Sequence, residues 1–97
     1  MNAETDFQLH AVVEGHVQGV GFRYFVIDRA EELKLTGWVR NTREGNVEVC
    51  AQGSREQLDK LLEALHRGPR AAFVTVVHEE WLPASGEWRD FSMKPTV

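Results

Sequence analysis

The segment GHVQGVGFR, residues 15–23, places three glycines directly before an arginine. Glycine permits positive φ and lets another group approach the backbone closely, and successive N–H groups in such a loop can converge on an anion. A guanidinium can hold two oxygens of a phosphate or a carboxylate at once. The segment therefore predicts a site for an anionic group, with Arg23 supplying the charge.

The glycines alone could also belong to a loop that only turns the chain. Arg23 favours a site, because it begins a segment with helical spacing, and a helix N-terminus disfavours a positive charge by a few tenths to about 1 kcal/mol. A residue placed against local preference is typical of a functional position. No Lys-Ser or Lys-Thr follows the glycines, and their spacing is not G-x-G-x-x-G, so neither common nucleotide loop is present.

The segments around this loop predict the elements that must position it. Residues 7–15 alternate apolar and polar side chains, as a strand with one face on a core does. Residues 23–35 carry apolar residues at helical spacing, and Gly37 is expected to end that helix. Residues 37–42 and 46–53 predict two strands that pair as a hairpin through a tight, glycine-containing turn.

A second helix and one or two further strands complete the chain. Ser54 is the expected N-cap of the helix, with Gln57 three residues later, and Gly68 is expected to end it. Residues 71–81 are rich in β-branched side chains and predict a strand, and residues 86–94 could add a short edge strand. This order is that of the ferredoxin-like split βαβ sandwich, an α+β fold with two helices on one face of a mainly antiparallel sheet. That fold hosts many functions, so the function must be inferred from the site.

The glycine segment also resembles the acylphosphatase signature, G-x-V-Q-G-V-x-F-R. The fixed positions of that signature are filled by Gly15, Val17, Gln18, Gly19, Val20, Phe22 and Arg23. A second family motif, G-W-V-R-N, stands at residues 37–41, and residues 66–77 are similar to the family's segment before its fourth strand. The resemblance covers nearly the whole chain and implies one acylphosphatase-like domain over residues 1–97.

What the resemblance implies is hydrolysis of an acyl phosphate to a carboxylate and inorganic phosphate, with no cofactor and no metal. Arg23 matches the arginine that binds the phosphoryl group together with the loop N–H groups. Asn41 matches the asparagine that holds the attacking water, although the sequence does not fix its distance from the loop. The implied phosphate-binding residues are His16, Val17, Gln18, Gly19, Val20, Gly21, Phe22 and Arg23. Nothing identified in the sequence recognises an acyl chain.

Composition limits the partners of this 97-residue chain. Its formal net charge is −4, whereas a general nucleic-acid binder usually shows a basic face, so we expect no nucleic acid. No apolar run approaches the roughly 18 residues that span a bilayer, and residues 1–10 lack a signal-peptide pattern. We therefore expect a cytoplasmic monomer without membrane contact. The one cysteine, Cys50, excludes an internal disulfide and is expected to be a packing residue in a strand.

Two other functions stay open from the sequence. The same order of elements occurs in RNA-recognition domains, which stack bases on aromatic residues of the central strands, but residues 46–53 contain no aromatic residue. The other alternative is a module that binds an anion without turnover. The family pattern also occurs inside larger maturation proteins that handle carbamoyl phosphate, and we expect none of their added domains in these 97 residues.

Overall fold

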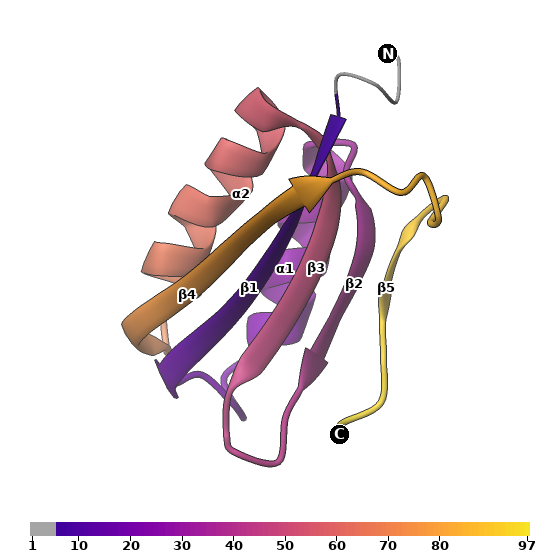
Figure 1. The fold of residues 1–97 in the computed structure, drawn as a ribbon. Coiled ribbons are helices and arrows are strands. Elements are labelled where there is room, and N and C mark those ends of the chain that lie inside the picture. Colours follow the sequence, from indigo (N-terminus) through magenta and orange to yellow (C-terminus); the bar gives the residue numbers. More distant parts are fainter. Residues whose placement is uncertain (1–5) are drawn as a thin grey trace.

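A computed structural model describes residues 6–97 of the chain. Its elements are β1 (Asp6–His16), α1 (Phe22–Glu32), β2 (Thr36–Asn41), β3 (Val47–Ser54), α2 (Arg55–Arg67), β4 (Phe73–Pro83) and β5 (Phe91–Met93). The strand order in the sheet is β4-β1-β3-β2-β5, with β5 parallel to β2 and the other neighbours antiparallel. Both helices cover the same face of this sheet (Figure 1). The predicted α+β ferredoxin-like sandwich, including the short edge strand, is confirmed.

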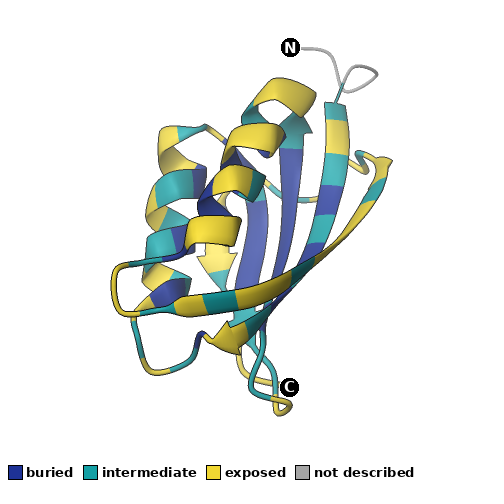
Figure 2. Cartoon of the chain, turned by 90° about the vertical axis from the view of Figure 1, so that its left-hand side faces the viewer, coloured by how far each residue is buried: buried dark blue, intermediate teal, exposed yellow. Residues whose placement is uncertain are grey.

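The hydrophobic core lies between the sheet and the two helices (Figure 2). The predicted alternation in β1 and β3 puts every second side chain on this side of the sheet. On the inner face of α1, Val26 is fully buried, whereas its neighbour Phe25 is half-buried. The strands and helices contribute Leu9, Ala11, Val13, Val47, Val49, Ala51, Phe22, Val26, Ala30, Leu58, Leu61 and Leu65.

Helix α1 ends earlier than predicted, and Gly37 is not its stop. Lys34 adopts a left-handed conformation with φ 59°, and the N–H of Leu35 donates to the carbonyl of Ala30 at 2.8 Å, which is a Schellman-type ending. Gly37 lies inside β2 instead, where an added Cβ would come within 1.9 Å of the Cys50 carbonyl oxygen. Glycine at this position is required by the close approach of β3.

The remaining predicted caps and the hairpin turn are confirmed. The Ser54 hydroxyl accepts the N–H of Gln57 at 3.2 Å at the start of α2. At the end of α2, Gly68 has φ 70° and its N–H donates to the carbonyl of Ala64 at 2.8 Å. Gly45, with φ 89°, occupies the turn between β2 and β3. These local signals fix where α2 and the hairpin begin and end.

The strand register brings the end of β2 toward the glycine loop. Strands β1 and β2 run in the same direction, because each is antiparallel to β3, which lies between them. Val47 of β3 pairs with Val13 of β1 on one side and with Asn41 of β2 on the other. Neighbouring strands are about 4.8 Å apart, so Asn41 lies about 10 Å from Val13, three residues before the end of β1. Val39 faces the core, and Asn41, two residues later, faces the helix side as well.

The sequence predicts neither a membrane-spanning segment nor a signal peptide. Within residues 6–97, no helix is long and apolar enough to cross a membrane. The expected lack of a signal peptide was drawn from residues 1–10, of which residues 1–5 lie outside the described part of the chain.

Candidate active site

The three glycines before Arg23 have two different structural roles. Gly15 lies at an irregularity in the pairing of β1 with β4, and a Cβ on it would come within 2.1 Å of the Phe73 carbonyl oxygen. Gly15 is therefore required by strand packing. Gly19 and Gly21 have φ 74° and 78°, and a Cβ on either would meet no atom within 4 Å. These two glycines shape the loop through their left-handed backbone and leave the space beside it open.

The loop and the start of α1 leave their N–H groups available. Among the described residues, no main-chain carbonyl accepts an N–H from residues 17–21. Gly21 is the N-cap of α1 and offers no side-chain cap, and the first turn contains no acidic residue. Free N–H groups and the helix dipole therefore create positive potential at this point, and the half-buried Arg23 adds a full charge.

A small pocket of about 100 Å³ opens at the loop. Its lining consists of Val17, Gly19, Gly21, Phe22, Arg23, Tyr24 and Asn41. The loop, the first turn of α1 and the end of β2 thus meet in one place, although Arg23 and Asn41 are far apart in sequence. The volume is below the roughly 300–1,000 Å³ of pockets for drug-sized ligands and suits a small anionic group.

Three of the residues implied by the resemblance do not line this pocket. His16 is exposed at the end of β1, and Val20 is half-buried and packs against the core. The Gln18 side chain is directed to the hairpin between β2 and β3. One lining residue, Tyr24, was not among the predicted site residues. Its position next to Arg23 on the first turn of α1 was the available indication, but a helical residue's exposure depends on the tertiary structure.

Asn41 has an unusual environment for a polar side chain. Its amide oxygen is buried and has no hydrogen-bond partner among the described residues. Burying an amide oxygen without a partner costs about 1–3 kcal/mol. Asn41 also lines the pocket that Arg23 lines, so its side-chain amide is suited to hydrogen-bond a molecule bound there.

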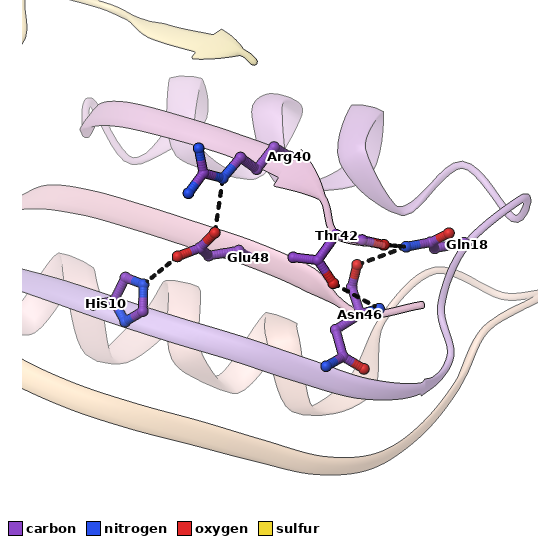
Figure 3. Close-up of polar contacts among 6 residues, drawn as sticks. All are labelled: His10, Gln18, Arg40, Thr42, Asn46 and Glu48. Carbon is purple, nitrogen blue, oxygen red and sulfur yellow. Dashed lines mark hydrogen bonds and ion pairs between the residues drawn. The ribbon is translucent and has the colours of Figure 1, made fainter. Parts of the chain in front are cut away.

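Gln18 ties the glycine loop to the hairpin that follows Asn41. Its side-chain amide donates to the carbonyl oxygens of Thr42 and Asn46, each at 2.8 Å (Figure 3). Thr42 is the residue after Asn41, so this bridge fixes the end of β2 relative to the loop. Both donors of the Gln18 side chain are thus directed to the hairpin, and Gln18 does not line the pocket.

Replacing Gln18 with alanine is expected to lower the free energy of unfolding by about 1–2 kcal/mol, since two carbonyl oxygens lose a donor. Urea unfolding followed by tryptophan fluorescence measures this change. Gln18→Glu keeps the shape but removes both donors and places a carboxylate against the two carbonyls, so it should cost at least as much. An unchanged unfolding midpoint in both variants would contradict a bridging role.

The opposite face of the sheet carries a separate polar network. Glu48 of β3 accepts from Arg40 of β2 and pairs with His10 of β1, both at 2.7 Å (Figure 3). Burial would raise the pKa of Glu48, but the hydrogen bonds and charges of His10 and Arg40 outweigh it and hold this pKa below its usual value. Glu48 therefore stays negatively charged at the centre of this face, where its carboxylate is held by His10 and Arg40.

Cys50 lies beside Glu48 on the same strand and is buried. Burial raises the pKa of its thiol to about 11, with further contributions from the negative charges of Glu48 and Glu87. Little thiolate forms at neutral pH, so Cys50 is a packing residue and a poor nucleophile.

A larger groove, of about 260 Å³, lies between α1 and α2. It is lined by Arg29, Glu32, Leu33, Lys60, Glu63, Ala64 and Arg67. Its charges alternate in sign, Arg29 already pairs with Glu32 at 3.3 Å, and none of its residues belongs to the glycine loop. The smaller pocket at the loop is therefore better suited to bind an anion, because its described lining includes Arg23 and no acidic residue.

A family model and several known proteins match the chain along most of its length. The Acylphosphatase model matches residues 9–93. The acylphosphatase of Salinibacter ruber is 42% identical over 94 residues, which cover 97% of this chain and 99% of that protein. The acylphosphatase of Pseudomonas paraeruginosa is 54% identical over 78 residues, covering 80% of this chain and 86% of that protein. The crystal structure of acylphosphatase from Bacillus subtilis has a TM-score of 0.88 and 38% identity, and covers 91% of this chain and 98% of that chain.

An α+β sandwich with a glycine loop, an arginine and an amide in one pocket is an arrangement suited to phosphoryl chemistry. The chain belongs to the acylphosphatase family. The resemblance drawn from the glycine segment is thus confirmed, and with it the prediction of a hydrolase of this class. The roles of the individual residues, Arg23 and Asn41 included, stay predictions.

Proposed function

We propose that this chain hydrolyses acyl phosphates to a carboxylate and inorganic phosphate in the pocket at the glycine loop. One observation carries the proposal: a single small pocket joins unpaired loop N–H groups, the Arg23 side chain and Asn41, whose amide oxygen is buried without a hydrogen-bond partner among the described residues. The first two suit a phosphoryl group, and the third suits a water molecule beside it.

Arg23 and the loop N–H groups are proposed to hold the phosphoryl oxygens. The guanidinium can bind two of them, and the N–H groups of the loop and of the α1 N-terminus can bind the others. The chain as a whole is negatively charged, so this local positive potential is what attracts a phosphate. Phosphoryl transfer depends mainly on such positioning and charge stabilisation.

The leaving group explains how so few functional groups suffice. A carboxylate has a conjugate acid of pKa about 4, so it departs as an anion and needs no general acid. In keeping with this, neither a carboxylate nor an imidazole belongs to the described lining of the pocket. Stabilising the phosphoryl oxygens is then the main task of the site.

Asn41 is proposed to orient the attacking water through its amide. An amide cannot take a proton near neutral pH, so a phosphoryl oxygen of the substrate receives the proton of the water. In this step the water oxygen forms a bond to phosphorus and the bond from phosphorus to the acyl oxygen breaks. The electron pair of the broken bond stays on the carboxylate, and the products are a carboxylate and inorganic phosphate.

We infer the remaining partners from the same features. The centre of the open sheet face carries the charged Glu48 held by Arg40 and His10, which disfavours stacked, anionic RNA and leaves that alternative without support. The substrate is thus a small acyl phosphate, with no nucleic acid or membrane partner. A single domain, a monomeric state and a cytoplasmic location stay predictions from the sequence.

Phosphate release from acetyl phosphate and from benzoyl phosphate tests the proposal. The purified chain should release phosphate and carboxylate in equal amounts over many turnovers. An Arg23→Ala protein purified in parallel should not do so, which controls for a contaminating phosphatase. Saturable binding of inorganic phosphate without turnover of either substrate would contradict hydrolysis and favour an anion-binding module.

A further inference from the structure

Tyr24 exposes an aromatic ring at the mouth of the pocket, and the proposed chemistry does not use it. It lines the pocket, and 67% of its surface is accessible. The other apolar lining residues with large side chains, Val17 and Phe22, are only 1% and 2% exposed. Tyr24 therefore offers the main apolar surface that a bound molecule could cover at this site.

The chemistry of phosphoryl transfer places the acyl group on the side of phosphorus that lies away from the attacking water. The attacking and leaving oxygens lie roughly in line on opposite sides of phosphorus. Asn41, which is proposed to hold the water, comes from the end of β2 in the sheet. Tyr24 comes from the first turn of α1, which forms a different wall of the same pocket. An in-line displacement directs the leaving carboxylate and its acyl chain away from Asn41, and Tyr24 offers an exposed apolar surface on a wall that Asn41 does not form.

We propose that Tyr24 is the specificity-determining contact for the acyl group, and that it favours acyl phosphates with an aromatic or extended apolar acyl chain. This inference rests on the proposed hydrolysis of acyl phosphates. A tyrosine ring presents a rigid, largely apolar face at low entropic cost, and aromatic groups pack on it in offset or edge-on geometry. The methyl group of an acetyl substrate is too small to cover that face.

The ratio of kcat/KM for benzoyl phosphate to kcat/KM for acetyl phosphate measures this preference. Tyr24→Ala is expected to lower the ratio about fivefold, the size of an aromatic contact. Tyr24→Phe keeps the ring and should hold the ratio within about twofold of the wild type, because packing rather than the hydroxyl carries the contact. Inorganic phosphate has no acyl group, so its inhibition constant should shift far less than the ratio does.

Phe73 provides a matched control for Tyr24. It is 70% exposed, it lies at the start of β4, and it does not line the pocket. Phe73→Ala should leave the ratio unchanged. An unchanged ratio in Tyr24→Ala, in a protein that still hydrolyses both substrates, would overturn the role of Tyr24 and leave the proposed function intact. Failure of the wild type to hydrolyse either substrate would instead overturn both.

Discussion

Replacing Arg23 with alanine is expected to lower kcat/KM for benzoyl phosphate by at least about 10³-fold. Among the described residues that line the pocket, only Arg23 carries a full positive charge, so no neighbour there replaces it. The loss should appear in phosphate binding as well as in turnover, because the same guanidinium is proposed to hold the phosphoryl oxygens of substrate and product. Steady-state kinetics and competitive inhibition by inorganic phosphate measure the two effects. Arg23→Lys keeps the charge but not the fork of donors and should recover only part of the activity.

Arg23→Ala should not destabilise the fold, so a loss of activity in this variant can be distinguished from misfolding. Arg23 stands in the first turn of α1, where a positive charge opposes the helix dipole. Arg23→Ala should therefore raise the free energy of unfolding by a few tenths to about 1 kcal/mol, or leave it unchanged. Arg29→Ala, on the same helix with its side chain in an exposed ion pair, is the matched control and should keep full activity. Unchanged phosphate inhibition in Arg23→Ala would show that the loop alone binds the anion.

The sequence predicted the elements of this fold well wherever a local pattern determined them. Period-two alternation in β1 and the cap at Ser54 are local, and both are confirmed. The predicted end of α1 was wrong because Lys34 takes the left-handed position that glycine usually fills at a helix end. Lys34 has no special preference for left-handed φ, so the sequence did not indicate it. Gly37 looked like the missing stop, but the tight approach of β3 is what requires it, and that contact exists only in the folded sheet.

The site divides in the same way into local and long-range parts. The glycine loop and Arg23 are contiguous, so their chemistry could be predicted from residue types alone. The bonds of Gln18 to Thr42 and Asn46 join residues 24 and 28 positions apart, and only strand order and register bring them together. The exposure of Tyr24 likewise depends on what packs against α1. The sequence could therefore indicate the candidate anion site but not the pocket wall formed by Tyr24.

Asn41→Ala is expected to lower kcat about 10²-fold while the inhibition constant of phosphate stays within about threefold. In the proposed mechanism, the Asn41 amide orients the attacking water and does not hold the phosphoryl group, so turnover and affinity should separate. Steady-state kinetics with benzoyl phosphate, and phosphate as inhibitor, measure both quantities. The pattern differs from that of Arg23→Ala, in which both should fall.

Asn41→Ala can distinguish a role of Asn41 in catalysis from a role in stability, because the buried amide oxygen has no hydrogen-bond partner among the described residues. Removing that oxygen costs no hydrogen bond, so the free energy of unfolding should change by less than about 1 kcal/mol. Asn41→Asp preserves the shape but sets a carboxylate beside the phosphoryl group, so it should weaken phosphate binding as well as turnover. Arg43→Ala, an exposed neighbour on the hairpin, should change neither. If Asn41→Ala kept wild-type turnover, the water would be held by other groups, and the uncompensated oxygen would need a different explanation.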